Sequence, residues 1–242
     1  MFKGSEFLVT ARTEVRRRPA RASYDRALAY QILDEALVCS VGFIARGEPH
    51  VMPMAFARLG DLLILHGAPA SRLLTTLCEG PRICVAVTLI DGLVLARSAM
   101  HHSLNYRSVV VFGSPFEILD PVEKQAALAR LVEHLMPGRS AATRAPNADE
   151  VRATRVLALP IEEASVKSRR GDPIDDEGDL GLPYWAGQIP LVLRAATPIP
   201  DSGHPPLVSA PAAASCYERG RIPSNITDGV GAALSSSRWP RP

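Results

Sequence analysis

Apolar residues recur at helical spacing near the start of the chain and then alternate with polar residues. The stretch 23–37, SYDRALAYQILDEAL, has the helical spacing, with Ser23 placed to cap the helix and Asp25 at the positive end of its dipole. A period of two, typical of strands, follows over 38–45, 50–57 and 62–66. Short turn-rich links separate these segments, so we expect antiparallel hairpins, with Pro53 at an edge or a bulge.

The middle of the chain continues this pattern after a short predicted helix at 69–80, which ends at a Gly-Pro pair. Two apolar stretches then flank Asp91-Gly92, one of the strongest hairpin-turn dipeptides, and predict a turn there. A buried strand is predicted over 109–118. Four polar residues stand directly before it, where a strand alone would not need them: Asn105, Tyr106, Arg107 and Ser108.

Capping signals mark two later helices. Asp120-Pro121-Val122-Glu123 is a capping box with proline at the first helical position, and it predicts a helix to about Leu135. The stretch 147–150 repeats the signature for a short helix. The apolar stretch 155–167 is predicted to be a strand that breaks near Pro160.

These elements define three regions. Residues 1–22 are charged and irregular and are expected to form a flexible N-terminal arm; residues 23–199 form the folded domain. Residues 200–242 are rich in Pro, Ala, Ser and Gly and are expected to be a disordered C-terminal tail. Inside the domain, the acidic stretch 169–183 is predicted to be a long loop of the kind that serves as a lid or binding element. Six or seven short strands with few helices predict a mainly β fold with flanking helices, a small antiparallel barrel.

Composition narrows the range of possible functions. The 242 residues are 47% hydrophobic, enough for a sizeable core, and the net charge of +2 creates no strong field for nucleic acid or membrane. The basic run Arg16–Arg18 is expected to be a solvated arm rather than a contact to a phosphate backbone. The four cysteines form no C-x-x-C pair, and the sequence has neither a signal-peptide pattern nor a span of about 20 apolar residues. We therefore expect a cytoplasmic protein.

His66 ends the third predicted strand and begins the segment HGAPASR. Small residues there let a ligand approach the backbone, and Ser71 and Arg72 place a hydroxyl and a guanidinium where both reach a phosphate. An ordinary loop with a surface arginine is the alternative. Trp185 is compatible with core packing or with a position beside a cofactor.

A second polar cluster contains Arg97, His101, His102, Tyr106 and Arg107. Adjacent histidines on a strand point to opposite faces, and no acidic or cysteine partner stands at ligand spacing, so no metal site is predicted. The cluster fits an anionic, planar ligand better. The sequence contains no G-x-S-x-G elbow, and its paired acids are expected to be a solvated surface, so hydrolase chemistry is not favoured.

Several of these stretches together resemble the pyridoxamine 5′-phosphate oxidase-like superfamily, and within it the flavin-nucleotide-binding proteins related to nitroimidazole-resistance (Nim-type) reductases. The resemblance runs from about Val15 to Leu193. It is carried by ILDEALVCSVGFIARGEPHVMPMAFA, LHGAPASRLL, LVLARSAMHHSLNYRSVVVFG and YWAGQIPL, of which HHSLNYRSVVVFG is the most specific.

This resemblance implies a split β-barrel that dimerises and holds FMN between its subunits. It assigns Met52, Pro53 and Met54 to the strand along the flavin ring, His66 to the strand beside it, and Ser71 and Arg72 to the phosphate. It assigns Asn105, Tyr106, Arg107 and Ser108 to the strand start that closes the site, and Trp185 to an aromatic that reaches the partner's flavin. Relatives often have a histidine where this chain has Ser40, and the pyridoxal-phosphate signature of the true oxidases is not recognisable.

The leading hypothesis is therefore an FMN-dependent oxidoreductase that acts on a small aromatic or nitroaromatic substrate, with His66 beside the reactive ring and NADH or NADPH as the electron donor. The competing hypothesis is a non-catalytic carrier or sensor of flavin or haem, with His66, His101 or His102 as an axial ligand. A DNA-binding regulator is a third hypothesis, which the near-neutral charge and the absence of a helix-turn-helix pattern disfavour.

Overall fold

The computed structural model describes residues 4–203, 209–215 and 217. The helices of this part of the chain are α1 (Arg26–Glu35), α2 (Arg72–Cys78), α3 (Pro121–Leu135), α4 (Ala148–Ala153) and α5 (Ala212–Ser215), with 3-10 turns η1 (Pro19–Arg21), η2 (Ala99–His101), η3 (Ser140–Ala142) and η4 (Glu177–Asp179). The strands are β1 (Ala22–Ser23), β2 (Val38–Ala45), β3 (Glu48–Leu59), β4 (Leu62–Gly67), β5 (Ile83–Leu95), β6 (Ser103–Gly113), β7 (Phe116–Glu117), β8 (Arg155–Pro160), β9 (Glu163–Arg169) and β10 (Gly187–Pro190).

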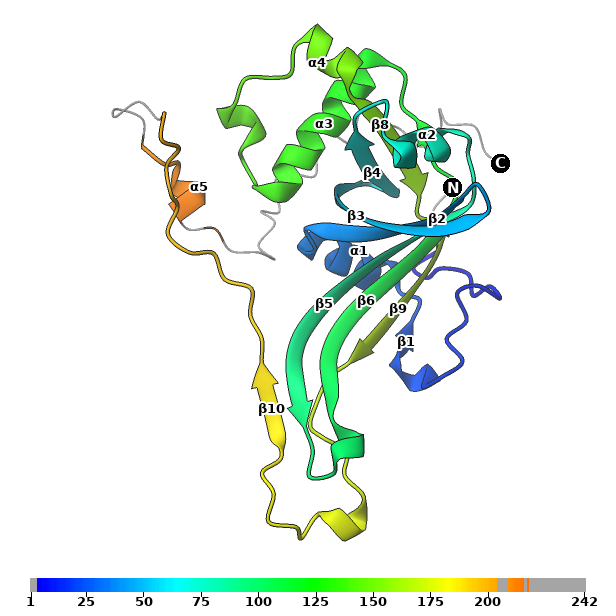
Figure 1. Cartoon of the computed structure of the whole chain (residues 1–242), viewed down its shortest axis with the longest axis vertical. Helices are drawn as coiled ribbons and strands as arrows, with labels where there is room; N and C mark the ends of the chain where they lie inside the picture. The colour runs from blue at the N-terminus through cyan, green and yellow to red at the C-terminus, as the bar shows by residue number, and fades with distance from the viewer. Residues whose placement is uncertain (1–3, 204–208, 216, 218–242) are drawn as a thin grey trace.

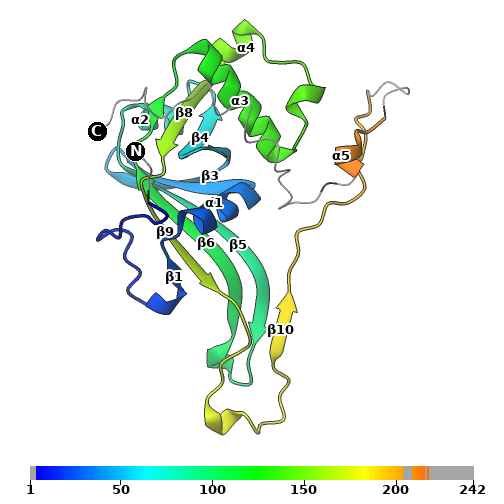
Figure 2. The same ribbon diagram turned by 180° about the vertical axis from the view of Figure 1, so that it is seen from behind.

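The strands form one antiparallel sheet in the order β1-β9-β6-β5-β2-β3-β4-β8-β7, with β10 added beside β5. The sheet bends into a split β-barrel, and the β5–β6 hairpin extends well beyond it together with β9 and β10 (Figures 1 and 2). Helices α2, α3 and α4 lie at the β4–β8 end of the molecule, away from the tip of that hairpin (Figure 1). The predicted mainly β fold is confirmed.

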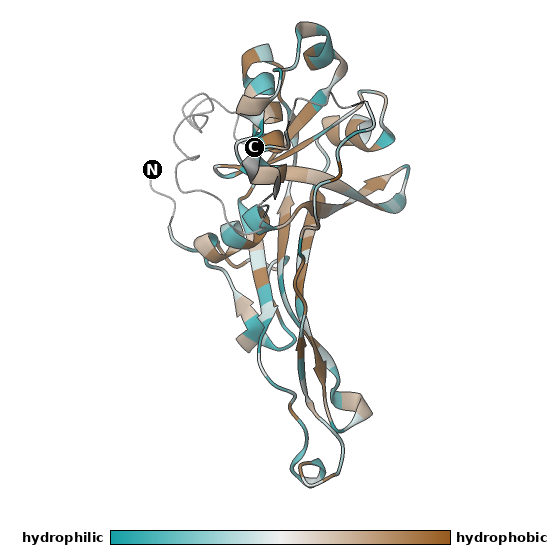
Figure 3. Ribbon diagram, turned by 90° about the vertical axis from the view of Figure 1, so that its left-hand side faces the viewer, coloured by the Kyte–Doolittle hydropathy of each residue, from teal (hydrophilic) through white to brown (hydrophobic). Residues whose placement is uncertain are grey.

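Strand alternation and helical spacing together build the core. Cys39, Val41 and Phe43 alternate along β2 and are buried, and Ile32 and Leu33 of α1 pack into the same cluster. A second, smaller cluster lies under α3. Brown apolar segments accordingly follow the barrel strands in Figure 3. No helix among the described residues is long and apolar enough to cross a membrane.

The capping signals locate most helices correctly. Asp120 accepts hydrogen bonds from the first-turn N–H groups of α3, which ends at Leu135 as predicted. Asn147 and Glu150 form the reciprocal capping box of α4. The cap of α1 was predicted wrongly, because Asp25, not Ser23, accepts the bond from Leu28 N, at 2.6 Å. Ser23 instead pairs with β9 as part of β1.

The predicted turn at Asp91-Gly92 is also wrong. β5 passes through these residues as one strand, with a shift of register between Ile90 and Gly92. β10 pairs along this part of β5, and a Cβ atom on Gly92 would lie 2.9 Å from the carbonyl oxygen of Ile189. Glycine therefore serves close backbone approach here rather than a turn. The chain reverses later, around η2.

The N-terminal segment, expected to be a flexible arm, packs on the barrel instead. Phe7 is 3% exposed, and its N–H donates to Tyr24 O at 2.8 Å. Arg12 pairs with Glu163 of β9, with 2.8 Å between Nη2 and Oε1. The expectation missed this contact because a lone phenylalanine has no periodicity to reveal it. Most of the predicted disordered tail lies outside the described residues.

The predicted strand 109–118 was placed too late, because β6 begins at Ser103 and contains Asn105–Ser108, and it ends at Gly113. The other boundaries agree better with the pattern. Residues 48–55 of β3, which include Pro53, pair with β2 alone, so this half of the strand is an edge. The strand 155–167 is broken after Pro160 into β8 and β9. Residues 170–186 form the long loop, with η4 as its one regular turn.

Candidate functional site

Two of the predicted site segments meet where β3 and β4 separate. Their pairing stops at Phe56 and Leu65, so the next residue of β4, His66, lies beside the beginning of the open half of β3. Met52, Pro53 and Met54 lie in this half; Met52 is 46% exposed, and Met54 packs against the core. His66 thus follows the last β4 residue that pairs with β3, and the Met-Pro-Met segment lies in the part of β3 beyond that pairing.

His66 has an unusual environment. Its side chain is half-buried, and within the described part of the chain its buried Nδ1 atom has no hydrogen-bond partner. Burial lowers the pKa of the imidazole below 6.5, because the protonated form loses hydration. His66 is therefore neutral near pH 7, and one of its ring nitrogens has no hydrogen-bond partner among the described residues.

Ser71 and Arg72 lie at the start of α2, a few residues beyond His66. Ser71 occupies the N-cap position, but its hydroxyl makes no capping bond. Arg72 is exposed and makes no ion pair with any described residue. Leu73, Leu74 and Leu77 bury the other side of the helix and hold it in place. We call Met52–Met54, His66, Ser71 and Arg72 the β4 cluster; its hydroxyl and guanidinium are both available to an anion.

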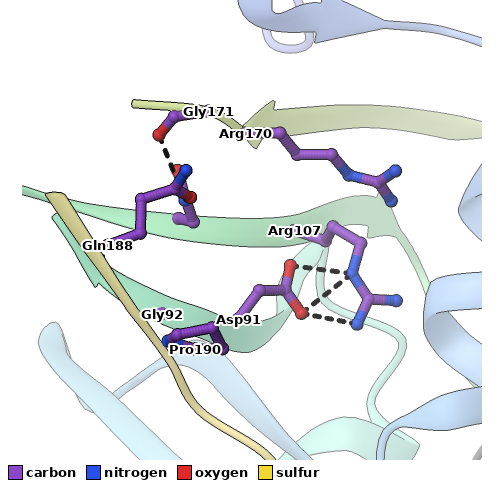
Figure 4. A pocket seen from close by; sticks show the side chains of 8 residues that line it. Asp91, Gly92, Arg107, Arg170, Gly171, Gln188 and Pro190 are labelled. Atoms are coloured by element: carbon purple, nitrogen blue, oxygen red, sulfur yellow. Dashed lines mark hydrogen bonds and ion pairs between the residues drawn. The ribbon is translucent and has the colours of Figure 1, made fainter. Parts of the chain in front are cut away.

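A pocket of about 370 Å³ lies between β5, β6 and β10. Its walls include Asp91, Asn105, Arg107, Arg170, Gln188 and Pro190 (Figure 4). Arg107 points at Asp91, with 2.7 Å between Nη2 and Oδ1, and it also pairs with Glu35 of α1. Both carboxylates raise the pKa of Arg107 above its ordinary value, the bond to Glu35 contributing most. These contacts use all but one of the five N–H groups of Arg107.

Asn105 is also occupied by structural contacts. Its side chain is buried, and its Oδ1 accepts a hydrogen bond of 2.5 Å from Arg169 Nη1. Its Nδ2 donates to Gln188 Oε1 at 2.5 Å and to Gly171 O at 3.2 Å. One amide thus joins β6 to the end of β9 and to β10, and sequence analysis gave no sign of Arg169 or Gln188 as its partners.

The other predicted residues are more dispersed. Ser108 donates its hydroxyl hydrogen to Lys167 O at 3.0 Å, and Tyr106 is half-buried on the same strand. Trp185 is 66% exposed, and its ring packs against Gly187, where an added Cβ atom would lie 2.9 Å from Cζ2 of the ring. Strands β5 and β2 separate β6 from β3 in the sheet. One chain therefore presents the predicted site as two groups, the β4 cluster and the pocket around Arg107.

A third group was missed because its members are far apart in sequence. Asp175, from the long loop, has a buried side chain that accepts hydrogen bonds from the N–H of Arg97 at 2.9 Å and from its Nη1 at 3.0 Å. The ligand atoms of His101, Asp175 and Asp179 lie within 4.8 Å of one another. No acidic residue stands at ligand spacing from His101 in the sequence, but the fold brings Asp175 and Asp179 beside it; Arg97 already neutralises Asp175.

Comparison with known proteins decides the family. The family model described as pyridoxamine 5′-phosphate oxidase matches residues 25–168, which is more than half of the chain. The chain belongs to this family. The pyridoxamine 5′-phosphate oxidase family assignment confirms the resemblance inferred from the sequence motifs, and it agrees with the split barrel. A search of curated proteins found no match.

Several solved structures are similar to this chain. The flavocytochrome Anf3 from Azotobacter vinelandii is 40% identical, with a TM-score of 0.80 over 85% of this chain and 95% of that one. The FAD and heme binding protein from Mycobacterium smegmatis is 33% identical, with a TM-score of 0.77 over 80% and 95%. A putative 5-nitroimidazole antibiotic resistance protein from Bacteroides thetaiotaomicron is 25% identical, with a TM-score of 0.52 over 60% and 85%.

Proposed function

We propose that this protein is a flavin-dependent oxidoreductase that works as a homodimer in the cytoplasm. The observation that carries the proposal is the 40% identity, over 85% of the chain, to a protein described as a flavocytochrome. When bound, a flavin supplies hydride and single-electron transfer, and the protein supplies binding, orientation and electrostatics.

The β4 cluster fits the chemistry of a flavin nucleotide. Arg72, which forms no ion pair with any described residue, and Ser71, whose hydroxyl makes no capping bond, offer a cation and a hydroxyl to the phosphate. Met52 offers an exposed apolar side chain for a flat ring, while Pro53 points to the opposite face of β3. Neutral His66 offers a nitrogen that can hold or release a proton. Asn105 and Arg107 are held by their own chain, so in this proposal they shape the adjoining pocket.

Haem binding is a second candidate function, and His66 is the observation that favours it. An axial ligand to haem iron is a neutral imidazole, and the burial of His66 keeps it neutral. His102 is more exposed than His66, although its Nδ1 lies 3.0 Å from Ser98 O, a contact that leaves Nε2 free for iron; His101 lies between Asp175 and Asp176. Two similar proteins are described as a flavocytochrome and as an FAD and heme binding protein. In this version, His66 holds the iron.

Absorption spectra of the purified protein test both candidates. A flavin band is expected, and chromatography of the released cofactor distinguishes FMN, which the sequence motifs imply, from FAD. A Soret band that disappears in His66→Ala would assign haem to His66. A colourless protein that binds no added flavin would refute the proposal, and bound flavin that neither NADH nor NADPH reduces would favour a carrier.

Arg72→Ala tests the phosphate contact. A charge-assisted hydrogen bond contributes about 1.5–3 kcal/mol, so the dissociation constant of FMN is expected to rise by at least tenfold. Fluorescence titration measures this change. Arg152→Ala, an exposed arginine on α4, is the matched control and should leave the affinity unchanged. Equal affinities for wild type and Arg72→Ala would remove Arg72 from the site.

The proposed substrate is a small aromatic or nitroaromatic compound. Anaerobic incubation of the reduced protein with a nitroaromatic compound is expected to remove the nitro absorption band at the rate at which the flavin is reoxidised. Reoxidation by oxygen alone, with no loss of that band, would contradict this substrate class.

A further inference from the structure

The segment after β10 has no cover from its own chain. Residues 191–203 are all exposed, and Val192, Leu193 and Ile199 are 84%, 76% and 92% exposed. The bond from Leu191 N to Asp91 O, at 3.0 Å, is the last backbone hydrogen bond between this segment and the barrel in the described residues. Figures 1 and 2 show the segment running apart from the barrel toward α5. We call residues 191–199 the strap.

The composition of the strap does not suit a free surface segment. Its sequence LVLRAATPI has one charged residue among nine and four large apolar side chains. Ordering an extended chain costs about 1–2 kcal/mol per residue, and neither internal hydrogen bonds nor apolar burial offsets that cost here. Contiguous exposed apolar residues of this kind mark an interaction site.

The chain also has an exposed apolar surface whose length matches that of the strap. The register pairs Ile44 with Pro49 and Gly42 with Val51, so these side chains share the outer face of the β2–β3 hairpin. Val38, Ile44 and Val51 on this face are 54%, 57% and 68% exposed. β2 is eight residues long, or about 26 Å, and the nine-residue strap spans at most about 30 Å.

The charges on the strap and the hairpin, and the attachment of the strap at both ends, are also compatible with docking. Arg194 of the strap and Glu48 at the start of β3 are exposed, have opposite charges and pair with no described residue. β10 holds the start of the strap beside β5, and Tyr217 donates its hydroxyl hydrogen to Leu135 O at 2.9 Å, so the chain contacts its own fold on both sides of the strap. In a dimer with twofold symmetry, each strap would cover the outer face of the other subunit, so the same contact would form twice.

We propose that the strap docks on the outer face of β2 and β3 of a second copy of this chain, with Leu193 near Val51 and Arg194 near Glu48. This inference rests on the homodimer of the proposed function and names the surfaces that form it. Of the β4 cluster it involves only Pro53, which pairs with Ser40 on this outer face; Met52 and Met54 lie on the other face of β3.

Analytical ultracentrifugation of the full-length protein tests the strap. Val192→Asp/Leu193→Asp is expected to raise the dimer dissociation constant at least tenfold, because it puts two charges into the contact. Thr197→Asp adds a charge to the strap without removing an apolar side chain, and it should change the constant less than threefold. An unchanged constant in the double variant, or a wild type that stays monomeric at every concentration, would overturn the proposal.

Disulfide cross-linking locates the contact. Two separately tagged proteins, one with Leu193→Cys and one with Val51→Cys, are mixed and oxidised, and the linked peptides are identified by mass spectrometry. A link between the two tags is expected. In a chain with both substitutions, a link confined to monomers would place the strap on its own barrel and overturn the proposal. Bound flavin is measured in parallel, so a colourless wild type refutes the flavin proposal while the cross-link still decides the strap.

Discussion

At the scale of single residues, the polar cluster at the start of β6, ahead of the predicted strand 109–118, makes structural contacts. Arg107 connects Asp91 to Glu35, and Asn105 connects Arg169 to Gln188. Residue types in the sequence predicted polar contacts there, but they did not identify the partners, which come from α1, β5, β9 and β10. Arg72 is the opposite case, because the structure leaves its charge unpaired among the described residues.

The half-buried imidazole of His66 predicts a dependence of stability on pH. Its pKa in the folded state lies below the unfolded value of about 6.5, so in acid the unfolded chain binds the proton more readily. The free energy of unfolding of the cofactor-free protein should therefore fall as the pH drops below about 6.5. Urea unfolding at pH 7.5 and pH 5 measures this loss, which should be smaller in His66→Gln.

His102→Gln is the control for this experiment, because it removes an exposed histidine and keeps His66. If His66→Gln and the wild type lose the same stability between the two pH values, His66 is not held neutral by burial.

At the scale of elements, local signals were sufficient for helices and insufficient for one strand. The caps of α3 and α4 depend on residues three positions apart, so the sequence displays them directly. Asp91-Gly92 has the local signature of a turn, but a segment almost 100 residues later pairs beside it and keeps β5 extended. The packing of Phe7 on the barrel is likewise a long-range contact without a local signature.

Phe7→Ala tests whether the N-terminal segment belongs to the core. Phe7 packs edge-on against Tyr30, at 6.3 Å between ring centroids, and under the guanidinium of Arg26. Replacing a buried phenylalanine with alanine costs about 3–5 kcal/mol, so the free energy of unfolding should fall by about 3 kcal/mol. Leu8→Ala, at a neighbouring position that is 78% exposed, should change it by less than about 0.5 kcal/mol. Urea denaturation measures both changes. Equally small effects of the two substitutions would support the predicted flexible arm.

Gly92→Ala tests the pairing of β10. The new Cβ atom would lie 2.9 Å from Ile189 O, so β10 is expected to move away from β5. Hydrogen exchange of residues 187–191 should then become at least tenfold faster, while exchange in β2 stays as in the wild type. Gly178→Ala is the control, since a Cβ atom there meets nothing within 4 Å. Unchanged exchange in Gly92→Ala would mean that β10 tolerates the methyl group.

At the scale of the whole molecule, the sequence motifs predicted one site, and one chain presents two groups of residues. The mainly β fold was predictable because alternation and turn residues act locally. The resemblance to the family added the prediction that the strands form a split barrel. The assembly of the site was not predictable from this pattern, because β5 and β2 lie between β6 and β3. We propose that the two groups come together across the homodimer, with Trp185, which is 66% exposed in a single chain, at the contact between subunits.

Ligand linkage tests the proposed site in the intact protein. A ligand that binds only the folded state stabilises it by about 2.7 kcal/mol at 100 times its dissociation constant, which should raise Tm by about 5–10 °C in a chain of this length. A tenfold weaker variant, Arg72→Ala, should lose roughly half of that shift with FMN. Riboflavin, which lacks the phosphate, should shift the wild type and Arg72→Ala equally. If riboflavin distinguishes the two proteins as strongly as FMN does, Arg72 contacts the ring or supports the fold, and the anion must lie elsewhere.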